Sequence, residues 1–82
     1  MWISSFVVTL APDTAHQRAV LDAIDAIPVF QLGELVGVKL PVVLETNDGA
    51  TARDWFEWVA QLPGVVHVDV AFVSFEEMEP SQ

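Results

Sequence analysis

The chain has no cysteine among its 82 residues, which excludes disulfide bridges, thiolate metal sites and cysteine nucleophiles. Basic residues are also scarce: twelve acidic residues stand against only Arg18, Lys39 and Arg53, and the net charge is −9. Such a surface repels nucleic acid and anionic membranes, so neither is expected as a partner. The acidity is compatible with a cationic partner and equally with simple colloidal solubility.

Long apolar runs and targeting signals are missing as well. No uninterrupted apolar run approaches the roughly 20 residues that a membrane-spanning helix needs. The first residues, MWISSFVV, lack the basic region and the cleavage site of a secretory signal. We therefore expect a cytoplasmic protein without membrane insertion, and the absence of cysteine agrees with this expectation.

The residues that are present favour a folded chain. Hydrophobic residues make up 52% of the sequence and the mean hydropathy is +0.44, which excludes disorder for most of the length. A chain this short forms one domain. We expect that domain over residues 1–76, followed by a short acidic C-terminal tail over residues 77–82.

Proline and glycine divide the chain into regular segments. Two segments with apolar residues at helical spacing predict helices over 11–28 and 47–64, ended by Pro28 and Pro63. Asn47 or Asp48 is expected to cap the second helix. Segments rich in β-branched and aromatic residues predict four strands, at residues 2–10, 29–35, 38–46 and from residue 64 onward.

The order strand–helix–strand therefore occurs twice, and the two halves match at an offset of 35 residues, which pairs Pro28 with Pro63. A doubled βαβ unit of this size predicts the α+β class and the ferredoxin-like split βαβ fold. Its antiparallel sheet should have the strand order 4-1-3-2, with both helices on one face. Pro41 then falls in a central strand, where we expect either a bulge or a second strand too short to need the missing hydrogen bond.

The alternation of side chains along each strand divides the strand residues between two faces. One set is expected under the helices: Phe6, Val8, Leu10, Leu40, Val42, Leu44, Val66, Val68, Val70 and Phe72. The other set is expected on an uncovered face: Ile3, Ser5, Val7, Thr9, Lys39, Pro41, Val43, Glu45, His67, Asp69, Ala71 and Val73.

Nothing in the sequence resembles an active site. His16 and His67 are the only histidines, and their separation matches no metal-ligand spacing. Ser4 and Ser5 have no accompanying base or oxyanion motif. Asn47 and its two successors are better explained as a helix cap than as a cation loop. We therefore predict a protein that is not an enzyme and holds no metal or cofactor.

The uncovered face of the sheet is the candidate site. An apolar patch beside Glu45 and Asp69 suits an amphipathic helix that carries positive charge and comes from another chain. The acids would attract and orient such a ligand more than they would strengthen its binding. The predicted site comprises Ile3, Ser5, Val7, Val43, Glu45, His67, Asp69, Ala71 and Val73. An acidic rim is expected from Glu34, Glu76 and Glu77.

Four short segments carry a family resemblance: ISSFVV in the first strand, VVLET in the third, LPGV after the second helix, and FEEME after the last strand. With these segments in this order, the whole chain resembles the NapD family of assembly chaperones for periplasmic nitrate reductase. The resemblance implies a cytoplasmic chaperone that binds the twin-arginine signal peptide of the nitrate reductase catalytic subunit, or of a related molybdoenzyme. Export would be delayed until the molybdenum cofactor is installed.

The resemblance further implies that the peptide docks as a helix on the uncovered face. The family often ends its last strand with a Tyr-His pair, whereas Phe72 and Val73 stand at the equivalent positions here. No ligand role is therefore transferred to these two residues.

Two other functions are compatible with the same fold. One is an ACT-like regulatory domain that senses a small molecule, and the other is a structural or oligomerisation subunit. In the second case the uncovered face would be buried by a partner or by another copy of the chain. For this protein we expect a monomer or a weak homodimer.

Overall fold

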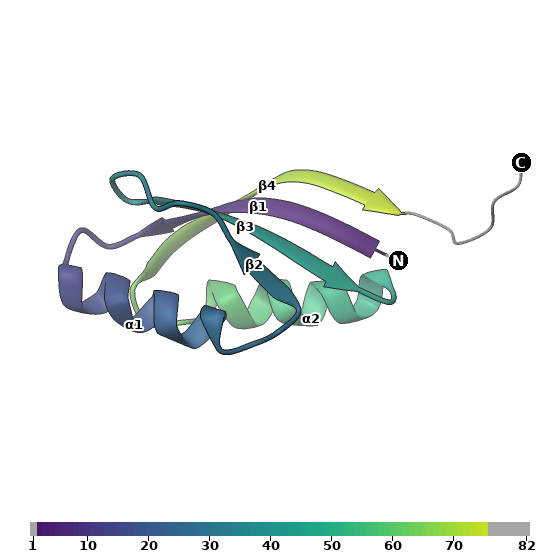
Figure 1. Cartoon of the computed structure of the whole chain (residues 1–82), viewed down its shortest axis with the longest axis horizontal. Coiled ribbons are helices and arrows are strands. Elements are labelled where there is room, and N and C mark those ends of the chain that lie inside the picture. The colour runs from purple at the N-terminus through teal and green to yellow at the C-terminus, as the bar shows by residue number, and fades with distance from the viewer. Residues whose placement is uncertain (1, 76–82) are drawn as a thin grey trace, which may run out of the picture.

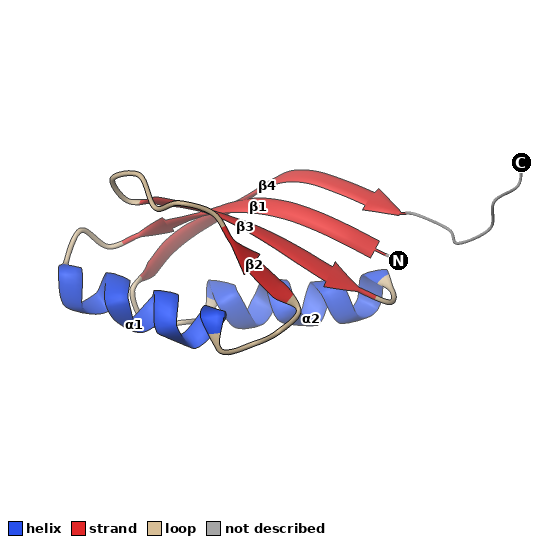
Figure 2. Ribbon diagram, in the orientation of Figure 1, coloured by secondary structure: helices blue, strands red, loops and turns tan. Residues whose placement is uncertain are grey.

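The computed structural model describes the backbone of residues 2–75 and side chains as far as Ala71. The elements in chain order are β1 (Trp2–Leu10), α1 (Thr14–Asp25), β2 (Phe30–Leu32), β3 (Lys39–Thr46), α2 (Gly49–Ala60) and β4 (Val65–Phe75). The four strands form one antiparallel sheet in the order β2-β3-β1-β4. Both helices cover the same face of this sheet (Figures 1 and 2). The predicted ferredoxin-like fold and strand order are confirmed.

Each helix begins at an aspartate whose side chain satisfies a free backbone N–H of the first turn. Asp13 accepts from the N–H of Ala15 at 3.3 Å, and Asp48 accepts from the N–H of Thr51 at 2.7 Å. Of the two expected caps for the second helix, Asp48 is therefore the one used. The first helix was expected from residue 11, but Pro12 precedes the cap and lies outside the helix.

The core lies between the helices and the covered face of the sheet. The inward positions of α1 and α2 that repeat at helical spacing include Val20, Ile24, Ala52 and Val59, all of which are buried. They meet the buried strand residues Phe6, Val8, Leu10, Phe30, Leu40, Val42 and Leu44. Burying each large apolar side chain contributes about 1.5–3 kcal/mol, which is how so small a domain stabilises its sheet.

Pro41 is accommodated because β2 is short. Strand β2 pairs with β3 only from Phe30 opposite Leu44 to Leu32 opposite Val42, so the ladder ends before it reaches Pro41. The carbonyl of Pro41 still accepts a hydrogen bond from the N–H of Gly33 at 2.8 Å. Of the two alternatives, a bulge or a short second strand, the short strand is therefore correct. Because β2 does not extend past this point, the sheet needs no hydrogen bond from the missing N–H of residue 41.

Strand β4 departs from simple alternation near its start. Thr9 pairs with His67 and Leu10 with Val65, which leaves Val66 as an additional residue in a β-bulge. Val65 consequently packs against the core, whereas Val66 is 66% exposed. The prediction that Val66 lies under the helices is wrong, because the bulge takes Val66 out of the ladder with β1 and Val65 packs against the core in its place.

A second bulge lies farther along β4. Ser5 pairs with Phe72 and Phe6 with Val70, so the exposed Ala71 is the additional residue. Val70 is on the helix side, as predicted, but it remains 55% exposed because its strand has a neighbour on one side only.

Beyond Ala71 the pairing of β4 with β1 is shifted by one residue. The register places Phe72 opposite Ser5 of the uncovered face and Val73 opposite the buried Ser4. The side chains of both residues lie outside the described part of the chain, so the faces predicted for Phe72 and Val73 stay predictions.

Within the described residues, neither helix has the length and apolar character needed to cross a membrane.

Candidate functional site: the open face of the sheet

The candidate site is the face of the sheet opposite the helices, which we call the open face (Figure 1). Its residues, as the strand register places them, are Ile3, Ser5, Val7, Thr9, Gln31, Lys39, Pro41, Val43, Glu45, His67 and Asp69. The predicted site residue Ala71 is the unpaired residue of the second bulge and is exposed. No described helix or loop covers this face.

The centre of the open face is apolar. Val7 lies between Pro41 of β3 and Asp69 of β4, and Val43 lies beside Ser5 in the neighbouring row. Val7 and Val43 are only half-buried, although they belong to the two central strands. Apolar side chains in the middle of a sheet stay accessible only when nothing packs on them, so this surface can accept an apolar ligand.

Polar side chains lie at the two ends of the apolar centre. At one end, Lys39 donates a hydrogen bond from Nζ to the hydroxyl of Thr9 at 2.9 Å. On the adjacent strand, Nε2 of His67 lies 2.8 Å from Oδ1 of Asp69. At the other end Glu45 stands opposite Ile3. The open face therefore has its one lysine at one end and a carboxylate at the other.

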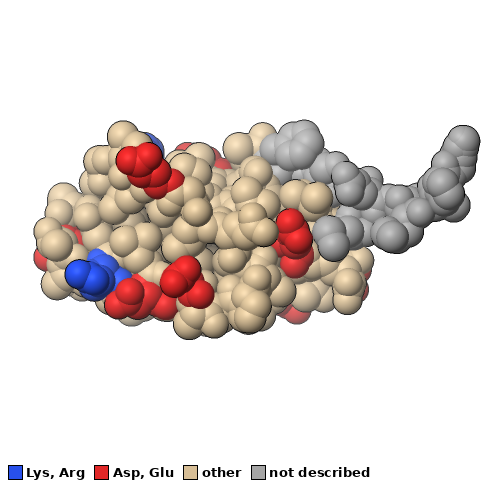
Figure 3. All heavy atoms as spheres, in the orientation of Figure 1, with Lys and Arg blue, Asp and Glu red and all other residues tan. Residues whose placement is uncertain are grey.

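Acidic side chains are spread over much of the surface seen in Figure 3, whereas basic atoms occupy only small areas of it. This distribution follows from the net charge of −9. A basic ligand would be attracted to the molecule over a distance of about one Debye length, roughly 8–10 Å at physiological salt.

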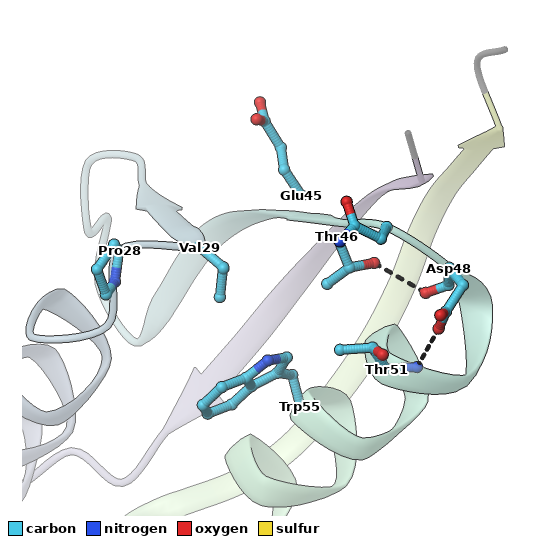
Figure 4. A pocket seen from close by; sticks show the side chains of 8 residues that line it. Pro28, Val29, Glu45, Thr46, Asp48, Thr51 and Trp55 are labelled. Atoms are coloured by element: carbon cyan, nitrogen blue, oxygen red, sulfur yellow. Dashed lines mark hydrogen bonds between the residues drawn. The ribbon is translucent and has the colours of Figure 1, made fainter. Parts of the chain in front are cut away.

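A cavity of about 370 Å³ adjoins the Glu45 end of the open face (Figure 4). It lies where β3 continues past the start of β2. Its lining residues are Pro28, Val29, Glu45, Thr46, Asn47, Asp48, Thr51 and Trp55. In Figure 4 the Trp55 ring borders the hollow from α2 and Val29 borders it from the segment before β2, whereas the carboxylate of Glu45 extends away from it, above the sheet.

The polar groups of this cavity are engaged in holding the start of α2. The Thr46 hydroxyl donates to the carbonyl of Asp48 at 2.9 Å, and the Asp48 carboxylate accepts from the N–H of Thr51. That hydrogen bond keeps the pKa of Asp48 below its usual value. No nucleophile–base pair is formed by these groups, and the described residues contain no cluster of three or more potential metal ligands.

Sequence reasoning missed this cavity. Its aromatic wall is Trp55, which makes edge-to-face contacts with Phe30 and Trp58 at centroid distances of 5.6 and 5.5 Å. A tryptophan in the second turn of a helix was the available signal. The hollow itself depends on where β2 begins, and the sequence pattern did not indicate that position.

Of the predicted acidic rim, only Glu34 lies within the described residues. Glu34 is exposed and lies just after Gly33, which is bonded to Pro41, so it is nearer the Lys39 end than the Glu45 end. Glu76 and Glu77 lie outside the described residues, as does the predicted tail. The side chain of Val73 is likewise not described.

Comparison with known proteins assigns the family. The family model described as NapD protein matches residues 1–77. No curated protein sequence matches the chain. Among solved structures, the solution structure of the E. coli Tat proofreading chaperone protein NapD is similar, with a TM-score of 0.76 and 23% identity. The match covers 99% of this chain and 86% of that one, and it shows a common fold. Because the family model spans nearly the whole sequence, this chain belongs to the NapD family.

Proposed function

We propose that this protein is a cytoplasmic assembly chaperone, without catalytic activity, that binds a twin-arginine signal peptide on the open face of its sheet. The bound peptide would belong to the catalytic subunit of a periplasmic nitrate reductase or of a related molybdoenzyme. While the chaperone is bound to the signal peptide, export of the enzyme would be delayed until its cofactor is installed. The observation that carries the proposal is an uncovered, apolar sheet centre beside carboxylates in a member of the NapD family.

The chemistry of the open face suits such a peptide. A twin-arginine signal combines positive charge near one end with an apolar middle, and a helix of that composition places its apolar side against Val7, Val43 and Ile3. Glu45 and Asp69 supply the opposite charge. Ordering the peptide as a helix costs about 2–5 kcal/mol of the gross interaction, so an apolar contact area is needed in addition to charge.

The distribution of charge also favours one direction for the peptide. Lys39 occupies one end of the open face, and Glu45 occupies the other, next to the cavity beside Trp55. A peptide whose arginines lie at the Glu45 end gains attraction there and avoids the lysine. In the opposite direction the arginines would meet Lys39, which is less favourable.

Isothermal titration calorimetry with a synthetic twin-arginine peptide tests the proposal. Val7→Gln introduces a bulky polar group at the apolar centre and should weaken binding by about 1–3 kcal/mol, or roughly 5- to 150-fold in Kd. Glu45→Lys should mainly slow association and flatten the dependence of binding on salt. Val70→Gln is the matched control, because Val70 is 55% exposed and lies on the helix side of β4, opposite to the open face.

Two results would contradict the proposal. Equal affinity in the Val7→Gln variant and the unsubstituted protein would show that the open face is not the binding surface. Equal affinity for the twin-arginine peptide and for a peptide of the same composition in scrambled order would show that the chain does not recognise a signal sequence.

A further inference from the structure

Strand β4 forms one edge of the sheet, and no described segment pairs with its outer side (Figure 1). The two edges differ greatly in length. Strand β2 has 3 residues, whereas β4 has 11. A long edge strand presents a row of free N–H and C=O groups, which makes it a template for a strand from another chain.

The direction of the backbone groups in β4 follows from Pro41. Residue pairs in an antiparallel ladder alternate between hydrogen-bonded and non-hydrogen-bonded types. Pro41 has no N–H and its carbonyl is bonded to Gly33, so the pair of Pro41 with Val7 is of the second type. The backbone groups of Val7 therefore point toward β4, where Val7 pairs with Asp69.

It follows that the backbone groups of Asp69 point inward to β1. Those of its neighbours Val68 and Val70 then point outward, to the free edge, because successive residues of a strand alternate in direction. Any strand that pairs with this edge must therefore form its hydrogen bonds to Val68 and Val70.

The sequence of this edge is complementary to itself. Residues 66–70 read Val-His-Val-Asp-Val. The valines are placed symmetrically about Val68, and a basic side chain (His67) on one side of Val68 matches an acidic side chain (Asp69) on the other. If two copies pair in antiparallel fashion about Val68, each Val66 lies opposite Val70 of the second copy. Each His67 lies opposite Asp69 of the second copy, and Val68 lies opposite its own counterpart.

This register agrees with the backbone directions. The central Val68 pair has its N–H and C=O groups facing outward from both copies and is therefore hydrogen-bonded. The pairs of His67 with Asp69 are then non-hydrogen-bonded, which is the type with the closer side chains. In the single chain these two side chains already contact each other, and they are 61% and 60% exposed. Two copies would join them into a cluster of alternating charge on the open face.

The exposed valines lie where this pairing would bury them. Val66 is 66% exposed and Val70 is 55% exposed, and they are among the described large apolar side chains that are most exposed. One bulge lies at each end of this segment, at Val66 and at Ala71. Because regular pairing stops at a bulge, the ladder between the two copies is limited to about five residues.

We propose that two copies of this chain associate reversibly through antiparallel pairing of their β4 edges about Val68. The product is one continuous eight-stranded sheet in the order β2-β3-β1-β4-β4-β1-β3-β2, with the two open faces side by side. Because each copy carries a charge of −9, mutual repulsion opposes association. The dimer is therefore weak, and added salt strengthens it by screening this repulsion.

Sedimentation equilibrium of the full chain tests the proposal, with protein concentrations up to about 1 mM, where even a weak dimer is populated. Dimer should form in the unsubstituted protein and increase with salt. Val70→Lys should raise the dimer dissociation constant by about tenfold or more, since it places a charge opposite each Val66 in two symmetric pairs. Val36→Lys, at an equally exposed valine outside the interface, should leave the constant unchanged apart from the small effect of charge.

A charge exchange separates this register from other modes of association. His67→Asp alone places two carboxylates opposite each other and should weaken the dimer. The double variant His67→Asp with Asp69→His restores complementary pairs and should restore association toward the original level. Both positions are exposed, so the variants are expected to fold as the parent does.

An isotope-filtered NMR experiment on a mixed labelled and unlabelled sample supplies the geometric test. In the proposed register the α-protons of His67 and of Asp69 in the second copy are close enough to give an intermolecular signal. A chain that remains monomeric at about 1 mM overturns the proposal. So does a dimer that is insensitive to Val70→Lys or not restored by the double variant.

Discussion

Gly64 connects α2 to β4 and adopts a φ of 98°, in the region that disfavours side chains. It also lies against the first helix, because a Cβ at this position would be 3.0 Å from Cβ of His16 and 3.2 Å from Cγ2 of Val20. At position 64 the backbone conformation and the close packing both require glycine. Gly37, in the turn before β3, has a φ of 63° but open space around it.

The two glycines provide a matched comparison. Gly37→Ala should lower the free energy of unfolding by about 1–2 kcal/mol, the cost of a left-handed residue. Gly64→Ala should cost clearly more, because the methyl group must also displace the His16 and Val20 side chains of α1. Urea denaturation measures both variants. Equal losses would mean that the approach of α1 to Gly64 contributes nothing to stability.

At the scale of elements, the two helices begin and end in the same way. Each is capped by an aspartate, and each ends three residues before a proline, at Asp25 before Pro28 and at Ala60 before Pro63. The Asp13 carboxylate is bonded to the side chain of His16 and to the N–H of Ala15, and Asp48 is bonded to the N–H of Thr51. These hydrogen bonds lower the pKa of both carboxyls below the usual 3.8.

The lowered pKa values predict how stability depends on acidity. A carboxyl with a lower pKa in the folded chain contributes stability above its unfolded pKa, and this contribution is lost as the pH falls through the folded value. The Tm should therefore decline below about pH 4, starting near the usual pKa of 3.8. Asp48→Asn keeps a capping oxygen but does not titrate, so its decline should be shallower. A parallel decline in both proteins, followed by circular dichroism, would contradict this account.

At the scale of the whole molecule, the two βαβ halves are interleaved. Strand β3 of the second half lies between β1 and β2 of the first, and β1 lies between β3 and β4 of the second. The buried residues of both halves form one continuous core, from Ile24 of α1 to Val59 of α2. Neither half can therefore bury its apolar surface without the other.

This arrangement predicts cooperative unfolding. Ile24→Ala should lower the free energy of unfolding by about 2–5 kcal/mol, because Ile24 is fully buried. Circular dichroism and tryptophan fluorescence, which includes Trp55 and Trp58 of α2, should shift to the same new midpoint. If the tryptophan transition kept its original midpoint, the halves would unfold independently.

Local patterns in the sequence were sufficient for most of the fold. The cap of the second helix, the helical spacing of Val20 and Ile24, and the alternation in β1 and β3 depend on neighbours along the chain, and the structure agrees with them. The centre of the candidate site, from Val7 to Val43, followed from the same alternation. That a ligand binds there remains a proposal.

The limits of the sequence appear in β4. A run of alternating valines from Val66 to Val70 predicted one regular face, but the bulge at Val66 exposes this residue and puts Val65 against the core instead. A bulge arises from fitting one strand to the twist and length of its neighbour, and local propensity carries no information about that fit.

What the sequence by itself determined is the set of helices and strands, their order, the buried faces of β1 and β3, and the acidic charge. These depend on residue type and on spacing along the chain. Only the tertiary structure decided the length of β2, the cavity beside Trp55 and the outward direction of the backbone at Val68 and Val70. Those features depend on which strands become neighbours and where each pairing stops, which is settled only when segments far apart in the sequence pack together.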